Sequence, residues 1–326
     1  MRSQIVGTGA YAPDKVLTNA ELEKLVETSD QWIVDRTGIR ERRIAAESQA
    51  TSDLAYEASI RALEMAGVKA EDLDLIIVGT VTPDMPFPST GTVLQARLKA
   101  KKAFAFDVSA ACAGSLYALS IADRYICSGG VKRALVIGAD ILTRITDWKD
   151  RNTCILFGDA AGAMVLAPTD DPNRGILSLH LHTDGSYWHI LNQPGGGSRL
   201  PISHRIVDER LCYVKMNGRE VYKVAVRALE ETCKEALAAN GMQPADVDYV
   251  IAHQANKRIL GSTLDRLGIP ASKCWMNLEK YGNTSSASMP TTLDEANRAG
   301  WLRPGNRILV MAIGGGLAWG AGIIRW

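Results

Sequence analysis

Short apolar runs alternate along the chain with longer stretches in which apolar residues recur every three or four positions. Several of the runs are dense enough in Val, Ile and Leu to be strands buried on both faces. The runs that predict strands cover residues 73–81, 103–109, 133–141, 248–254 and 307–315. The stretches with helical spacing cover residues 51–67, 112–130 and 218–241, and they end at glycine, a common helix stop. This alternation predicts an α/β protein.

The chain also resembles itself at one fixed offset of 174 residues. The matching segments are residues 62–77 with 236–251, residues 135–136 with 309–310, and Cys112 with Ser286. One such match could arise by chance in an apolar α/β sequence, but three at the same offset favour a duplication. We therefore expect two similar halves, each a sheet covered by helices, at 1–170 and 171–326.

A long connection at residues 184–215, within the second half, is rich in Gly and Pro and contains Tyr187 and Trp188. Connections of this length with little regular structure usually cover a functional site or are mobile. An elaborated surface hairpin explains the same pattern, and the sequence leaves both interpretations open.

Composition narrows the function classes. Lys and Arg number 37 against 36 Asp and Glu, a net charge of +1, which argues against a nucleic-acid partner. No apolar run reaches the roughly 18 residues of a membrane span, and the first residues resemble a strand and turn more than a secretion signal. We expect a cytoplasmic protein without membrane segments.

Neither a disulfide framework nor a metal site is indicated. The six cysteines are scattered and form no CxxC pair. His180 and His182 would share one face of a strand, but no acidic or thiolate ligand stands near them in the sequence. The GxG motifs at both ends of the chain lack the remaining features of a dinucleotide site, so no nucleotide cofactor is expected.

Three separated residues are candidates for chemistry. Cys112 follows an apolar strand and starts a helix, where backbone N–H groups and the helix dipole favour a thiolate. His253 ends another strand, and Asn283 precedes the counterpart of the Cys112 turn, so all three would lie at one edge of paired sheets. Gly314–Gly316 could supply N–H groups to an oxyanion. Cys112 is equally well explained as a small buried residue, and His253 as a structural one.

Several long motifs in order resemble the β-ketoacyl-acyl carrier protein synthase III family, the initiating condensing enzymes of bacterial fatty acid synthesis, in the thiolase superfamily. The motifs are SDQWIVDRTGIRERR at 29–43, DVSAACAG at 107–114, FGDAAGA at 157–163, HQANKRI at 253–259, GNTSSAS at 282–288 and GGGLAWG at 314–320. The resemblance implies a duplicated thiolase-like fold in α-β-α-β-α layers. It also implies a homodimer that needs no cofactor, because coenzyme A (CoA) enters as a thioester substrate.

The family pattern assigns roles to individual residues. Cys112 would take the acyl group from acyl-CoA, while His253 and Asn283 would bind the malonyl-acyl carrier protein thioester and stabilise the enolate formed as CO2 departs. The N–H groups of Cys112 and Gly315 would form the second oxyanion hole. The residues implied for CoA binding are Trp32 and Arg151 around the adenine, Arg36 and Thr37 near the phosphates, and Asn256 at the pantetheine.

The resemblance also implies an acyl pocket and a docking surface. Phe87 would close the pocket of the neighbouring subunit, with Leu142 and Phe157 in its wall, which predicts acetyl-CoA as the primer. Ser115 stands where many relatives carry Phe and could open a second channel. The residues expected to face the acidic carrier protein are Lys223, Lys257, Arg258 and Arg266.

Other functions remain compatible with these residues. Relatives of the family start polyketides and other secondary metabolites, so the primer and the pathway do not follow from the fold. A thioesterase or simple acyltransferase could use Cys112 with His253 as general base. A protein that only binds acyl-CoA would need neither residue for catalysis.

Overall fold

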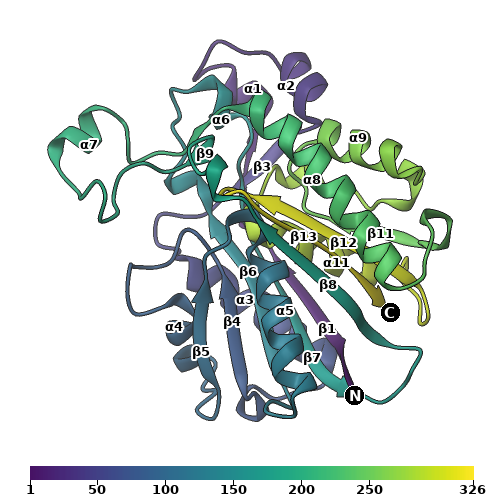
Figure 1. The fold of residues 1–326 in the computed structure, drawn as a ribbon. Coiled ribbons are helices and arrows are strands. Elements are labelled where there is room, and N and C mark those ends of the chain that lie inside the picture. The colour runs from purple at the N-terminus through teal and green to yellow at the C-terminus, as the bar shows by residue number, and fades with distance from the viewer.

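The computed structural model describes all residues from 1 to 326, and most of its strands form two sheets (Figure 1). The first sheet has the order β1 (Arg2–Tyr11), β7 (Asp159–Thr169), β6 (Ala134–Ile141), β4 (Leu75–Gly79) and β5 (Phe104–Val108). The second has the order β8 (Gly175–Thr183), β13 (Ala318–Arg325), β12 (Arg307–Gly314) and β11 (Tyr249–Ala252). The pairs β4–β5, β4–β6 and β11–β12 are parallel, and the remaining pairs in the two sheets are antiparallel.

Helices form three layers around the two sheets. The helices α3 (Thr51–Ala66) and α4 (Thr90–Arg97) pack on the outer face of the first sheet, and α8 (Gly218–Ala239) and α9 (Lys257–Leu267) pack on the outer face of the second. Between the sheets, α5 (Gly114–Cys127) and α11 (Ser288–Arg298) share one buried core with residues of both. The expected α-β-α-β-α layering is therefore confirmed. None of the helices is both long enough and apolar enough to cross a membrane.

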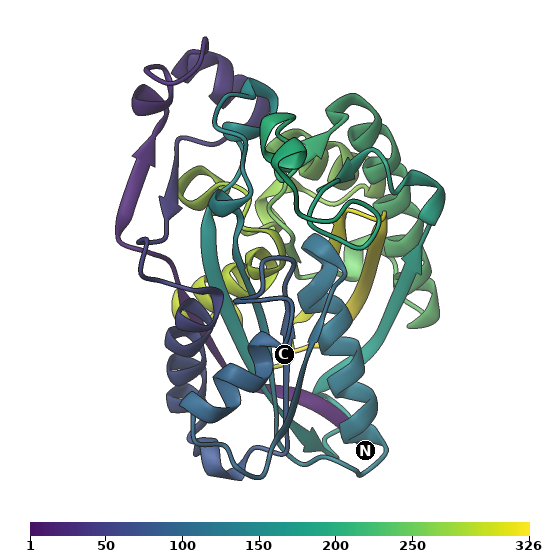
Figure 2. The same ribbon diagram turned by 90° about the vertical axis from the view of Figure 1, so that its left-hand side faces the viewer.

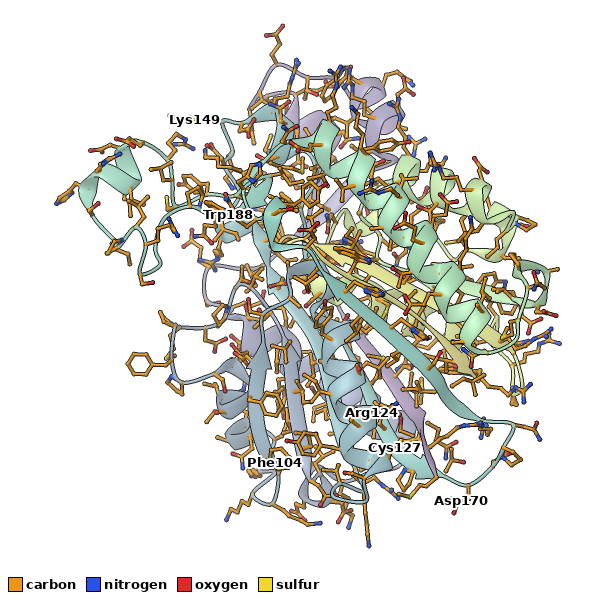
Figure 3. The ribbon with its side chains drawn as sticks, viewed as in Figure 1. Phe104, Arg124, Cys127, Lys149, Asp170 and Trp188 are labelled. Carbon is orange, nitrogen blue, oxygen red and sulfur yellow. The ribbon has the colours of Figure 1, made fainter.

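The duplication is visible element by element at the offset predicted from the sequence. The short 3₁₀ turns at 70–72 and 111–113 recur at 244–246 and 285–287, and the helices α5 and α11 begin at Gly114 and Ser288. The fifth strand position of the second sheet is reduced to one bridge, between Val250 and Cys274. The turn from β7 to β8, which contains Asp170 (Figure 3), joins the two sheets, and we propose it as the boundary between halves 1–170 and 171–326.

The segment after β1 forms a cap at one end of the sheets. It contains the antiparallel pair β2 (Lys15–Thr18) and β3 (Glu41–Ile44), with α1 (Asn19–Leu22) and α2 (Asp30–Thr37) between them, shown in purple at the upper left of Figure 2. The Ser29 hydroxyl accepts a hydrogen bond from the Trp32 N–H at 3.2 Å and so starts α2. Gly38 ends α2 with a φ of 84°, which glycine adopts without strain. The cap shares a core with α6 (Arg151–Cys154) and α10 (Leu278–Tyr281), which brings it to the functional cavity described below.

The connection at 184–215 divides into two parts. Its ends form a small sheet, β9 (Leu191–Asn192) with β10 (Lys215–Met216), and contribute Leu191, Gln193 and Val214 to the wall of that cavity. Its middle carries α7 (His204–Asp208) on an arm that stands away from the body (Figure 1), where Ile202 is 85% exposed. Both interpretations of this segment therefore apply, each to a different part.

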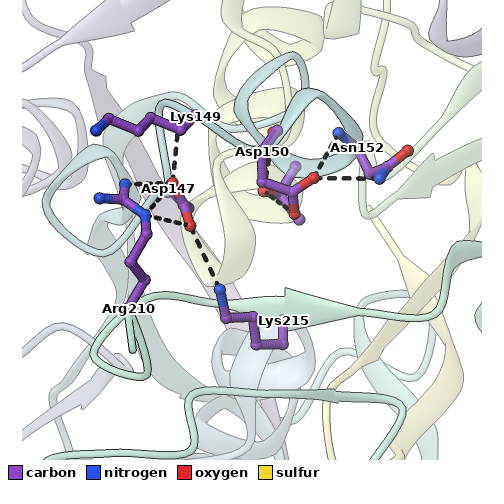
Figure 4. Close-up of polar contacts among 7 residues, drawn as sticks. Asp147, Lys149, Asp150, Asn152, Arg210 and Lys215 are labelled. Atoms are coloured by element: carbon purple, nitrogen blue, oxygen red, sulfur yellow. Dashed lines mark hydrogen bonds and ion pairs between the residues drawn. The ribbon is translucent and has the colours of Figure 1, made fainter. Parts of the chain in front are cut away.

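The arm is held to the first half by the buried carboxylate of Asp147 (Figure 4). Arg210 Nε lies 3.1 and 3.0 Å from its two oxygens, Lys215 Nζ lies 3.3 Å from one of them, and the Lys149 N–H donates to it at 3.0 Å. The hydrogen bonds from Arg210 are the main cause that lowers the pKa of Asp147 to about 2. This ion-pair cluster joins segments more than 60 residues apart in the chain.

Asp147→Asn should loosen the arm and remove a pH-dependent part of the stability. Because the folded pKa lies below the usual value of about 3.9, this stabilisation is complete above about pH 5 and is lost as the pH falls towards 2. The variant should unfold more easily than the wild type at pH 7, with the difference vanishing near pH 2. Limited proteolysis at pH 7 should cut residues 193–213 faster. Asp170→Asn, at an exposed carboxylate, is the control, and a pH-independent difference would contradict the assignment.

Candidate active site

Cys112 lies at the end of β5, in the 3₁₀ turn that precedes α5. The turn is tight, and Ala111 has a φ of 46°, which is uncommon for a residue with a side chain. Two glycines make room for it. A Cβ at Gly314 would lie 2.3 Å from the Cys112 nitrogen, and a Cβ at Gly79 would lie 2.5 Å from the Gly114 carbonyl carbon. Close backbone packing therefore fixes where the sulfur sits.

The electrostatic setting of Cys112 differs from the expectation. Burial raises the pKa of the Cys112 thiol to about 12, more than hydrogen bonding by the Ser285 side chain lowers it. Desolvation disfavours the thiolate and is the largest influence on this pKa. The predicted lowering of this pKa is wrong for the protein without substrate. The sulfur is held as a thiol.

His253 follows β11 and is 3% exposed. The backbone N–H of His253 donates to the Met311 carbonyl oxygen at 2.8 Å, which continues the pairing of β11 with β12. Burial lowers the pKa of the His253 imidazole to about 3, so the ring is neutral at physiological pH. The Nδ1 atom lies 3.0 Å from the hydroxyl oxygen of Ser288 in α11.

Asn283 is held by the strand-like segment that contains Phe157. The backbone N–H of Asn283 donates to the Leu156 carbonyl oxygen at 2.8 Å, and its backbone carbonyl oxygen accepts from the Gly158 N–H at 3.1 Å. The Asn283 Oδ1 atom accepts from the Ser285 N–H at 2.9 Å. Because the amide oxygen is engaged there, the NH2 group is the end available to a ligand.

One cavity of about 790 Å³ brings these residues together. Its wall contains Cys112, His253, Asn283 and Gly315, as expected. Of the other predicted residues, those that also line it are Trp32, Arg36, Thr37, Leu142, Phe157, Asn256 and Arg258. Apolar residues form more than half of the lining, which suits a site that holds an acyl chain and a few polar anchors.

The predicted adenine site is closed by its own side chains. The guanidinium carbons of Arg36 and Arg151 lie 4.6 and 4.7 Å from the centre of the Trp32 ring. Arg151 also donates to the Glu27 carbonyl oxygen at 2.9 Å, and it does not line the cavity. An aromatic ligand that stacked on Trp32 would replace one of these cation–π contacts.

The remaining predicted residues lie apart from the cavity. Phe87 is 85% exposed and does not line this cavity. Arg266 forms an ion pair with Glu230 at 2.9 Å, and Lys223 and Lys257 are exposed on α8 and α9. Ser115 is fully buried, 3.0 Å from a Cβ placed on Gly138, and does not face the cavity. Ser115 therefore opens no second channel from this cavity.

Sequence reasoning missed several contributors to the site. Arg219 and Tyr222, at the start of α8, line the cavity mouth, and Ser285 lines the cavity beside Cys112. Ser285 could have been identified from the sequence, because the 174-residue offset aligns it with Ala111, next to Cys112. Both Ala111 and Ser285 have positive φ. His180 and His182 contact Glu235 of α8 at 3.0 and 2.6 Å, but no group of three or more such side chains could hold a metal.

A duplicated fold with a cysteine on a buried turn of one half, and histidine and asparagine from the other half facing it, defines an acyltransferase of the thiolase superfamily. Comparisons with known proteins agree. The 3-oxoacyl-[acyl-carrier-protein] synthase III profile matches residues 106–185, and the profile of the C-terminal part of that family matches residues 237–326.

Individual relatives are similar over almost their whole length. The β-ketoacyl-[acyl-carrier-protein] synthase III of Caldanaerobacter subterraneus subsp. tengcongensis is 52% identical, covering 99% of this chain and 97% of its own. The crystal structure of the corresponding Aquifex aeolicus synthase, 48% identical, aligns with a TM-score of 0.93 over 99% of this chain and 100% of that one. A priming β-ketosynthase of a polyketide biosynthetic pathway is 35% identical, with a TM-score of 0.92 over 99% and 95%. This chain belongs to the β-ketoacyl-acyl carrier protein synthase III family.

Proposed function

We propose that this chain joins an acyl group from acyl-CoA to malonyl-acyl carrier protein, with loss of CO2, to give a 3-oxoacyl-acyl carrier protein. The observation that carries the proposal is the single cavity that contains Cys112, His253 and Asn283 in a member of this family. The same cavity contains Trp32 and Arg36 at the positions that the family uses for CoA. The reaction needs no metal and no redox cofactor.

In the first half-reaction, the Cys112 sulfur attacks the thioester carbonyl carbon of acyl-CoA. A carbon–sulfur bond to Cys112 forms, the bond to the CoA sulfur breaks, and the thiol proton leaves with CoA as its thiol. Because the pKa of Cys112 is raised by burial, proton loss accompanies the attack and does not precede it. The N–H groups of Cys112 and Gly315 would stabilise the negative charge on the carbonyl oxygen.

In the second half-reaction, His253 and Asn283 would donate hydrogen bonds to the malonyl thioester oxygen. Loss of CO2 leaves the electron pair in an enolate, whose carbon attacks the acyl group on Cys112. The new carbon–carbon bond forms as the carbon–sulfur bond breaks, and the Cys112 thiolate is then protonated. No protein base is needed, because decarboxylation itself generates the carbanion. A neutral histidine suits a donor role.

The same protonation state argues against the hydrolytic alternative. A thioesterase would need His253 to take a proton from water, and an imidazole whose pKa is lowered to about 3 is a weak base at pH 7. A different primer remains an alternative within the same chemistry, since a similar priming ketosynthase serves a polyketide pathway.

We also propose a cytoplasmic homodimer. The strand β5 is at the edge of its sheet, and Phe104 (Figure 3) and Tyr125 beside it are more than 40% exposed. A second copy could pair with this edge and cover these aromatic rings. The exposed Phe87 would then be free to enter the cavity of the partner subunit.

Single substitutions at Cys112, His253 and Asn283 should separate the two half-reactions. Cys112→Ser should abolish acyl loading, because an alcohol is a much weaker nucleophile than a thiol at the same place. His253→Ala and Asn283→Ala should load acyl groups normally but lose CO2 release by about 100-fold or more. Intact mass after exposure to acyl-CoA measures loading, and CO2 release from malonyl-acyl carrier protein measures the second step. Equal loss of loading in all three folded variants would contradict this division.

Reversing the charge of Arg258 should weaken carrier-protein binding. Arg258 lines the cavity mouth and is held by a hydrogen bond from its Nε to the Asp35 carbonyl oxygen at 3.0 Å. Arg258→Glu should raise the KM for malonyl-acyl carrier protein about tenfold at low salt, with a smaller effect on acyl-CoA. Arg303→Glu makes the same charge change at an exposed site before β12, the strand that ends at the active site. Equal KM values for both variants would remove Arg258 from the docking surface.

Phe87 should limit primer length across the subunit interface. We expect kcat/KM to be highest for acetyl-CoA and low for octanoyl-CoA and isobutyryl-CoA, because extra methylenes cannot enter a filled pocket without strain. Phe87→Thr should raise the octanoyl-CoA value without changing the dimer, which light scattering would check. A wild type that prefers octanoyl-CoA or isobutyryl-CoA would refute this assignment.

A further inference from the structure

The hydroxyl of Ser288 joins His253 to the start of α11. Ser288 is the first residue of this helix and is 1% exposed. Its Oγ atom lies 3.0 Å from His253 Nδ1 and accepts a hydrogen bond from the Gln254 N–H at 2.5 Å. Two consecutive residues after β11 are thus held by one oxygen.

The direction of the bond to His253 follows from what each atom can do. A serine hydroxyl has one proton to donate and two lone pairs to accept with. The Gln254 N–H occupies a lone pair, and being only a donor it cannot take the hydroxyl proton. His253 Nδ1 is the other hydrogen-bond partner of this oxygen, so it is the atom that can accept the proton. A neutral imidazole that accepts at Nδ1 carries its own proton on Nε2.

We propose that Ser288 is a positioning residue that holds His253 in the tautomer protonated on Nε2, so that this N–H faces the substrate thioester oxygen. The inference rests on the donor role proposed above for His253. In the opposite tautomer a lone pair on Nε2 would face the developing oxyanion and repel it. A buried neutral ring has no bulk water to settle this choice, so a neighbouring side chain must do so.

The amide group of Asn283 is also oriented by a hydrogen bond from the segment 285–288. Its amide oxygen accepts from the Ser285 N–H, which leaves the NH2 group for the substrate. Residues 285–288 therefore fix the donor ends of both side chains. The 174-residue offset places His253 and Ser288 where Gly79 and Gly114 stand in the first half. There the backbones are so close that a Cβ on Gly79 would lie 2.8 Å from the Gly114 carbonyl oxygen. In the second half, the end of β11 and the start of α11 occupy the equivalent place, and there the side chains of His253 and Ser288 make the contact.

The test compares the wild type with Ser288→Ala. The variant should load acyl groups on Cys112 normally and keep its KM for malonyl-acyl carrier protein, while kcat for condensation falls about tenfold or more. Long-range ¹⁵N–¹H correlation spectra of ¹⁵N-histidine-labelled protein should show Nδ1 unprotonated and Nε2 protonated in the wild type, and a mixture in the variant. The His253→Ala spectrum assigns the signal among the five histidines.

Thr291→Val is the matched control. Thr291 lies in the same helix, is buried, and donates only to the Ser288 backbone carbonyl oxygen at 2.9 Å, so its loss should leave kcat and the His253 spectrum unchanged. A wild-type spectrum with the proton on Nδ1 would overturn the proposal even if Ser288→Ala fails to fold. A folded Ser288→Ala enzyme with the wild-type kcat would overturn it as well. Retained condensation in His253→Ala would instead contradict the role of His253.

Discussion

Close backbone packing between two short turns is the constraint on which the rest of the site depends. The turn that carries Cys112 and its counterpart at 285–287 meet between the sheets, against the ends of β4, β6 and β12. A Cβ at Gly138 would lie 2.0 Å from the Ser286 carbonyl oxygen, and one at Gly314 would lie 2.3 Å from the Cys112 nitrogen. Side chains cannot separate these backbones, so the nucleophile and the donors from the other half stay in one place without a substrate.

Burial that comes with this packing sets the protonation states. It raises the pKa of Cys112 and lowers that of His253, and both groups are therefore neutral when the cavity holds no substrate. Nearby, the buried carboxylate of Asp140 accepts hydrogen bonds from the Val81 and Ser286 N–H groups, which ties the turn at 285–287 to the end of β4. Donors fixed in this way need no reorganisation when negative charge develops on a thioester oxygen.

Local patterns were sufficient to predict the strands β4, β5, β6, β11 and β12 and the helices α3, α5 and α8, because hydrophobic period and glycine stops are properties of neighbouring residues. The duplication could be predicted because its 174-residue offset recurs in the sequence. The positions of Cys112, His253 and Asn283 at strand ends made them candidates, but their roles and the CoA residues needed the family motifs. What could not be predicted came from contacts between distant segments. The pKa of Cys112 depends on its burial, Ser115 packs near Gly138, and Glu235 of α8 contacts His180 of β8. The connection at 184–215 is anchored through Asp147, and nothing in the sequence indicates that its residues pair with this carboxylate.

The duplication explains how one scaffold separates two kinds of chemistry. Equivalent positions in the two halves carry different residues: the first half has Gly79, Cys112 and Gly114, and the second has His253, Ser286 and Ser288. The half with glycines leaves room beside its sulfur, and the half with side chains supplies oriented N–H groups. Because the two turns pack on each other, these differences face one shared cavity. A nucleophile and an enolate-stabilising pair thus arise from one repeated backbone, and neither half could form the site alone.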